Sequence, residues 1–342
     1  MIKQQSNRSI SIMLLHIIGM VMIVLRHVAQ MENNGILGEI FICGVPLFLF
    51  VSGYLTGKKE VEKVGRWYLK KVQRIWIPLF VFVIVHFTVL EITKTKDVSF
   101  LQWMFCIFNL QGFNYTFWKF QLYGAVVGAG HLWFLTTLMF AYLLVPVLQE
   151  FGKIKLKTWQ KRLVLPILLL VQLGLLYVGG QMSYLITFFS GYFLAKRPEK
   201  LRGGKNYLFV TLLTVLTTTA RLVSRQVIDA TLFYDSYIAL ISAAMIGVWI
   251  FYTVFFIEEK MPKLMRIFDC KIVRFIEKVS FYVYLTHMMF IEDTYLILNH
   301  IGNKPLRYTI GAILSFVTAI LLWLIVEKVI LKIIGFKKRK KH

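Results

Sequence analysis

The chain consists largely of apolar stretches of about 20 residues that recur from one end to the other. An α-helix of about 20 residues is long enough to cross the hydrocarbon core of a bilayer. Apolar residues make up 58% of the 342 residues, and the mean hydropathy is +0.66, which is too high for an ordinary soluble domain. The sequence therefore predicts an all-α integral membrane protein.

The apolar stretches predict a bundle of about ten transmembrane helices. No polar linker or internal repeat interrupts the series, so we expect one transmembrane domain over residues 1–342. The first stretch is too long for a signal peptide and is expected to be a retained span. The ten predicted spans are Ile10–Gln30, Ile36–Gly57, Ile75–Ile92, His131–Gln149, Leu163–Gly179, Ser183–Ala195, Tyr207–Ser224, Phe233–Ile257, Ser280–Asn299 and Tyr308–Val326.

The basic residues predict the orientation of these spans. The net charge is +23, and 32 of the 40 Lys and Arg residues fall in alternate loops and in the two terminal segments. Cytoplasmic loops of membrane proteins carry this excess, so we expect both termini in the cytoplasm, including a basic tail at 332–342. This distribution argues against nucleic acid as a partner and favours membrane lipids with anionic head groups.

Two predicted cytoplasmic segments, 58–74 and 258–279, have helical periodicity with an apolar face and a basic face. Such helices usually lie in the plane of the membrane interface. A second interpretation is that Arg74 also holds a phosphate group, because arginine forms paired hydrogen bonds to such oxygens. The sequence leaves both interpretations open.

Residues 93–130 form a long predicted extracytoplasmic segment. Its part from Phe100 to Phe113 is apolar but too short to span, so we expect a re-entrant or interfacial element. The remainder is rich in aromatic residues and glycine. These rings are suited either to stacking on sugars or to an aromatic belt at the head-group level, and composition does not choose between the two.

Two histidines lie eleven residues apart in the first span, His16 and His27. Eleven residues make about three helical turns, so the two side chains share one face, separated by roughly 16 Å along the axis. An ionisable group inside a span is costly, and the default interpretation is a functional site. The pair suggests chemistry carried out inside or across a bilayer.

Five motifs follow one another along the chain. His16 and His27 are separated by ten residues, Pro46 opens an aromatic stretch that ends in Ser52-Gly53, and Arg74-Ile75 is followed by Pro78. The last two motifs are His131-Leu132-Trp133-Phe134-Leu135 and a Ser-x-x-x-Tyr-Leu-x-His pattern from Ser280 to His287. In this order the sequence resembles the integral-membrane acyltransferases of acyltransferase family 3.

The resemblance implies a bundle of about ten transmembrane helices and transfer of an acyl group, usually acetyl, from cytoplasmic acyl-coenzyme A. The implied acceptor is a hydroxyl group of a cell-surface glycan or a lipid-linked glycan precursor. Acetyl-coenzyme A or another acyl-coenzyme A is the expected donor, and no metal is expected. The implied location is the bacterial plasma membrane.

The resemblance also assigns roles to residues. His27 is the expected general base, since histidine titrates near neutrality, and His131 and His287 are candidates for orienting substrate or sharing the proton. His16 stands where the family usually has arginine or lysine. Arg26 is a second candidate for the missing positive charge, and Arg74 is the first candidate for the coenzyme A phosphates.

The alternative hypothesis is a transporter of glycans or lipid-linked glycans. Ten spans and charged residues in apolar surroundings are compatible with transport. Transporters often contain structural repeats with broken helices at corresponding positions, and the sequence shows none. The five ordered motifs favour the enzyme.

Overall fold

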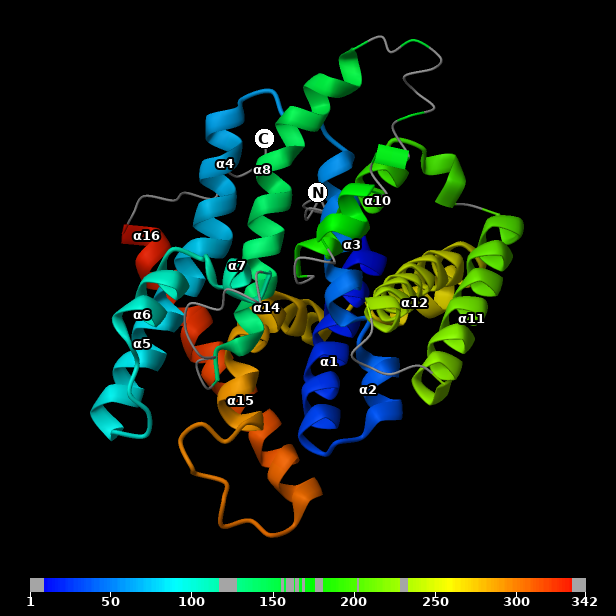
Figure 1. The fold of residues 1–342 in the computed structure, drawn as a ribbon. Helices are drawn as coiled ribbons and strands as arrows, with labels where there is room; N and C mark the ends of the chain where they lie inside the picture. Colours follow the sequence, from blue (N-terminus) through cyan, green and yellow to red (C-terminus); the bar gives the residue numbers. More distant parts are fainter. Residues whose placement is uncertain are drawn as a thin grey trace. The chain divides into compact units, whose positions relative to one another are not determined.

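The computed structural model describes residues 9–116, 128–154, 157, 163, 166–167, 170–175, 181–201, 203–227 and 233–333. Throughout this part of the chain the regular elements are helices (Figure 1). Packing of the Cα atoms divides the chain into two compact units, each assembled from segments distant in the sequence. Unit 1 comprises Met1–Glu60 and Ser183–Ser280, and unit 2 comprises Val61–Met182 and Phe281–His342.

Unit 1 is built on helix α1 (Ile10–Met31), which packs against the helices that follow it and against α12. Helices α11 and α12 also pack along each other (Figure 1). A hydrophobic core joins α1, α3 and α12, with Leu15, Leu47 and Phe251 among its fully buried side chains. The other helices of unit 1 are α2 (Gly35–Phe41), α3 (Gly44–Gly57), α10 (Leu185–Ala195), α11 (Gly204–Val227), α12 (Phe233–Lys260), α13 (Pro262–Ile267) and the first part of α14 (Lys271–Ile291).

Unit 2 begins with one long helix in which a π-helical turn, Val72–Trp76, joins two α-helical parts. A 3₁₀ turn at Gly130–Leu132 leads directly into α8. The last part of α14 also belongs to this unit. Its other helices are α4 (Val64–Lys71), α5 (Ile77–Thr93), α6 (Phe100–Ile107), α7 (Gln111–Thr116), α8 (Trp133–Lys153), α15 (Lys304–Leu324) and α16 (Leu331–Ile333).

Within the described residues, seven helices are long and apolar enough to cross a membrane. They correspond to seven of the ten predicted spans. The predicted sixth span is present as a shorter apolar helix, Met182–Ala195, and most of the fifth span, Leu163–Gly179, lies outside the described residues. The seven helices cover Ile10–Met31, Gly35–Gly57, Val64–Thr93, Gly130–Lys153, Gly204–Val227, Tyr237–Lys260 and Lys304–Ile333.

The predicted ninth span, Ser280–Asn299, has the wrong boundaries. Helix α14 starts nine residues earlier, at Lys271, and ends at Ile291. It ends there because Asp293 adopts a left-handed conformation, with φ of 48°, and its carboxylate accepts a hydrogen bond from the Leu298 backbone at 2.9 Å. No glycine or proline lies between Lys271 and Ser280 to prevent the earlier start.

The two segments predicted as interfacial helices have different boundaries from those expected. Segment 58–74 is continuous with the third span, so that a single helix runs from Val64 to Thr93. Segment 258–279 is divided into the end of α12, the short helix α13 and the beginning of α14.

The predicted second span is interrupted at Ile42–Cys43, between α2 and α3. Pro46 near the start of α3 has no backbone N–H to donate, which is compatible with the first turn of a new helix.

The apolar part of segment 93–130 forms two short helices, α6 and α7, separated by a corner at Asn109. The Asn109 side chain donates to the Leu135 carbonyl at 3.2 Å, and Gln111 donates to the Leu132 carbonyl at 2.9 Å. These bonds attach the corner to the beginning of α8. Residues 117–127, which hold most of the aromatic and glycine-rich part, lie outside the described residues.

Helices α3 and α10 approach each other so closely that they contact through backbone atoms. A Cβ atom on Gly53 would collide with the Phe188 carbonyl oxygen, and one on Gly191 would collide with the Phe50 carbonyl oxygen. Small residues allow such close approach between membrane helices. Gly53 of the Ser-Gly motif is therefore required for packing.

We expect Gly53→Ala to lower the midpoint of thermal unfolding of the purified protein. The added methyl group forces α3 and α10 apart, and overpacking of this kind costs about 1–3 kcal/mol or more. The matched control is Gly204→Ala in α11, where a Cβ would have no neighbour within 4 Å. Equal midpoints for the two variants would contradict the close-packing role.

The orientation predicted from the basic residues can be tested with reporters. We expect a reporter fused after His342 and one inserted near Lys200 to be cytoplasmic, and one near Tyr115 to be external, because positive charge is retained on the cytoplasmic side. An external carboxyl terminus would contradict the predicted topology.

Candidate active site

Helix α1 carries both histidines of the first motif. The helix is continuous from Ile10 to Met31, so the eleven-residue spacing places His16 and His27 on one face. Met20 and Ile23 on the same face are buried. Both histidines belong to unit 1 and are partly exposed.

His16 pairs with a buried carboxylate. Its Nδ1 lies 3.1 Å from Oε1 of Glu277 in α14, and its ring stacks on Phe48 of α3 at a centroid distance of 6.0 Å. Glu277 is only 7% exposed, and a buried carboxylate is costly unless a positive charge or several hydrogen bonds accompany it. The structure therefore places a carboxylate beside the residue that stands at the family's basic position.

His27 stands near the end of α1 that is predicted to face outward. Its ring hydrogen-bonds to the side chain of Gln30, one turn further along the helix. The residue as a whole is partly exposed, and a group that exchanges a proton with a substrate must be within its reach.

Arg26 is placed against α2 rather than beside His16. Arg26 lies ten positions after His16 along α1, which corresponds to about 15 Å. Its guanidinium group occupies the space where Gly38 lacks a side chain, within electrostatic range of Glu39. The prediction that Arg26 compensates for His16 therefore has no geometric support.

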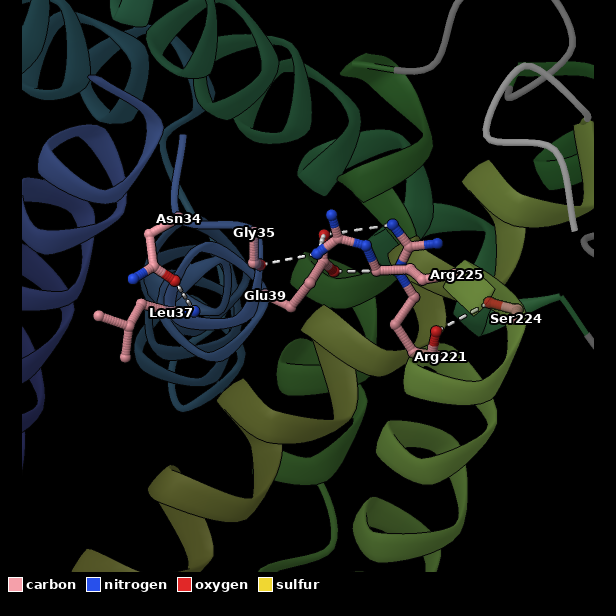
Figure 2. A network of polar contacts seen from close by, with 7 residues as sticks. All are labelled: Asn34, Gly35, Leu37, Glu39, Arg221, Ser224 and Arg225. Atoms are coloured by element: carbon pink, nitrogen blue, oxygen red, sulfur yellow. Dashed lines mark hydrogen bonds and ion pairs between the residues drawn. The ribbon is translucent and has the colours of Figure 1, made fainter. Parts of the chain in front are cut away.

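Glu39 anchors a charged network that the sequence analysis did not assign to the site. Arg221 of α11 donates to both Glu39 oxygens, Nε to Oε2 at 2.9 Å and Nη2 to Oε1 at 3.2 Å (Figure 2). Arg225 lies 3.5 Å from Oε1 and donates to the Gly35 carbonyl at 2.7 Å. The sequence contained a signal for this pair, because Glu39 and Arg221 are opposite charges inside two predicted spans, and such charges usually pair with each other.

His131 and His287 lie together in unit 2. Their ring centroids are 4.7 Å apart with an interplanar angle of 67°, and both side chains are buried. The Tyr284 hydroxyl donates to the His131 carbonyl at 2.6 Å, and His287 Nδ1 lies 2.7 Å from the Tyr284 carbonyl. Because a carbonyl only accepts, His287 Nδ1 carries a proton, and Nε2 is the acceptor in the neutral ring.

Arg74 lies in the π-helical turn at the start of α5, and its side chain is exposed. Lys71, one turn earlier, stacks on Tyr142 at 3.6 Å from the ring centroid. The role of Arg74 as a phosphate contact stays a prediction. Among the residues that the structure describes, no group of three or more His, Cys, Asp or Glu side chains is placed to hold a metal ion.

The predicted site residues are divided between the two units. His16, Arg26 and His27 belong to unit 1, whereas Arg74, His131 and His287 belong to unit 2. Within unit 2, the described structure brings the rings of His131 and His287 into contact.

Comparison with known families gives one match. The model of an acyltransferase domain family matches residues 9–324. The chain belongs to acyltransferase family 3. The match covers both units and all six predicted site residues, and together with the seven apolar helices it identifies a multi-pass membrane protein. No curated protein and no solved structure matches the chain.

Proposed function

We propose that this acyltransferase moves an acyl group, which we expect to be acetyl, from cytoplasmic acyl-coenzyme A to a hydroxyl group of an extracytoplasmic or lipid-linked glycan. The observation that carries the proposal is the family match over residues 9–324, which includes the paired histidines of α1. We place the enzyme in the bacterial plasma membrane, with its basic loops on the side of the donor.

His27 is the proposed general base. The acceptor hydroxyl attacks the thioester carbon, a C–O bond forms and the C–S bond breaks. His27 takes the hydroxyl proton and passes it to the departing coenzyme A thiolate, so the proton balance closes without a metal. Its partial exposure and its hydrogen bond to Gln30 are compatible with this role.

Arg74 is the proposed contact for a coenzyme A phosphate. Its exposed guanidinium lies on the basic side of the predicted topology, and charge-assisted bonds to phosphate are among the strongest in proteins. His16, whose ring contacts the Glu277 carboxylate, is proposed to provide a positive charge along the path that the donor takes beside α1. Under this topology the thioester passes along α1 to reach His27.

His131 and His287 are proposed as positioning residues. Both are buried, and Tyr284 contacts both by hydrogen bonds. A group that receives a proton from substrate must be reachable, so we assign direct proton transfer to His27 and support of the site to this pair.

The experiment that tests the function uses the purified full chain and acetyl-coenzyme A labelled in the acetyl group. We expect label to move to isolated cell-surface glycan, and NMR of glycans from cells with and without the protein to differ in O-acetyl groups. Glycan flux across vesicles without consumption of the thioester would instead support the transporter hypothesis.

A further inference from the structure

Among the described residues, a group of arginines lies around Glu39 at the end of unit 1 near His27. We call Arg26, Arg221, Arg225 and Glu39 the arginine cluster. Among the described side chains, three guanidinium groups there face one carboxylate. Arg221 is 7% exposed and the Glu39 side chain 12%, so the inner part of the cluster is largely removed from solvent.

Glycine in α2 allows two of the arginines to approach its backbone. A Cβ on Gly38 would collide with Arg26 Nη1, and a Cβ on Gly35 would lie 2.5 Å from Arg225 Nη2. Figure 2 shows the Arg221 and Arg225 side chains reaching Glu39 and Gly35. Helix α2 thus accommodates guanidinium groups at two positions separated by one turn.

A purely structural ion pair does not account for three arginines. Arg221 already uses both Glu39 oxygens, and this bidentate pair is sufficient to link α11 to α2. Two further guanidinium groups near the same carboxylate repel each other, and this repulsion is stronger where water is scarce. An additional anion would relieve it.

We propose that the arginine cluster binds an oxyanion of the acceptor, either a carboxylate of an acidic sugar or a phosphate of the lipid carrier. Guanidinium groups recognise both through paired hydrogen bonds. Arg26 and His27 are consecutive residues of α1, so the arginine cluster lies at the same level of this helix as the proposed base, although the two side chains point about 100° apart. This inference rests on the proposed function for the identity of the acceptor, but the anion site can be tested without acyl transfer.

The test measures binding of small probes to the purified full chain in detergent, in the absence of acyl donor. The probes are sodium pyrophosphate, sodium glucuronate and uncharged glucose, and the readout is the ligand-induced shift of the thermal unfolding midpoint. We expect one or both anions to raise the midpoint, and glucose to leave it unchanged. Pyrophosphate alone would indicate the carrier phosphate, and glucuronate alone would indicate an acidic sugar.

Arg225→Gln is the informative variant, because its side chain is 37% exposed and its loss leaves the Arg221–Glu39 pair intact. We expect its affinity for the anion to fall roughly tenfold, as for loss of one charge-assisted bond. Arg225→Lys should retain more of the affinity, and Arg307→Gln in α15 is the control for an arginine elsewhere.

Two outcomes overturn the proposal: no response of the wild-type chain to either anion, or equal anion binding in the wild type and Arg225→Gln. Gly38→Ala, which displaces Arg26, provides a second variant that leaves every charge in place. Failure of acyl transfer with intact anion binding would reject the proposed function alone. Acyl transfer without anion binding would reject the anion site alone.

Discussion

Replacing His27 with alanine is expected to abolish acyl transfer while leaving the donor bound. Loss of a general base costs typically 10²–10⁴-fold in rate, and the imidazole is the proposed acceptor of the hydroxyl proton. The measurement is transfer of labelled acetyl to glycan by purified protein, alongside titration of acyl-coenzyme A for affinity. His300→Ala, at an exposed histidine after α14, is the matched control and is expected to retain full activity.

Arg74→Ala separates the two halves of the mechanism. We expect it to weaken donor binding roughly tenfold, because it removes a charge-assisted contact to phosphate, and to reduce transfer only as far as binding is reduced. Normal membrane insertion of both variants is checked first. Full transferase activity in His27→Ala would reject its assignment as the base.

Much of the fold follows from local sequence properties. Length and hydropathy identify seven of the spans, because a continuous apolar stretch of membrane length has few alternatives to a helix. The boundaries were less predictable. Helix α14 begins at Lys271 because nothing in residues 271–279 interrupts the helical periodicity. A hydropathy window places the charged residues of this segment outside the span, even though the helix continues through them.

The partners within the site were not predictable from sequence. His16 and Glu277 lie 261 residues apart, and nothing local to either one indicates the other. The contact between His131 and His287 likewise depends on how the turn Gly130–Leu132 packs against α14. Motif order suggested which residues matter, whereas the charge of Glu277 beside His16 emerged only from tertiary structure.

The same limit applies to Arg26. Its position beside His27 in the sequence suggested that it compensates for His16, but neighbouring helical residues point about 100° apart. The structure directs its guanidinium group to α2 and the neighbourhood of Glu39. Sequence adjacency was therefore a poor guide to its partners.

His16→Arg is expected to retain transferase activity, and to make it less dependent on pH than in the wild type. The imidazolium loses its proton as pH rises, whereas a guanidinium stays charged at any working pH. Wild-type activity should therefore fall with rising pH more steeply than that of the arginine variant. His16→Ala is expected to lose activity by roughly tenfold, through loss of the charge that faces Glu277.

Glu277→Gln tests whether charge, rather than packing, makes His16 important. Glutamine preserves the volume and the hydrogen-bonding capacity of Glu277 but removes the negative charge 3.1 Å from His16 Nδ1. We expect it to reduce activity more in the wild-type background than in the His16→Arg background, because an arginine stays charged without the carboxylate. The measurement is the pH profile of acyl transfer for the wild type, His16→Arg, Glu277→Gln and the double variant. Identical profiles for wild type and His16→Arg, with full activity in His16→Ala, would show that this position only fills space between α1 and its neighbours.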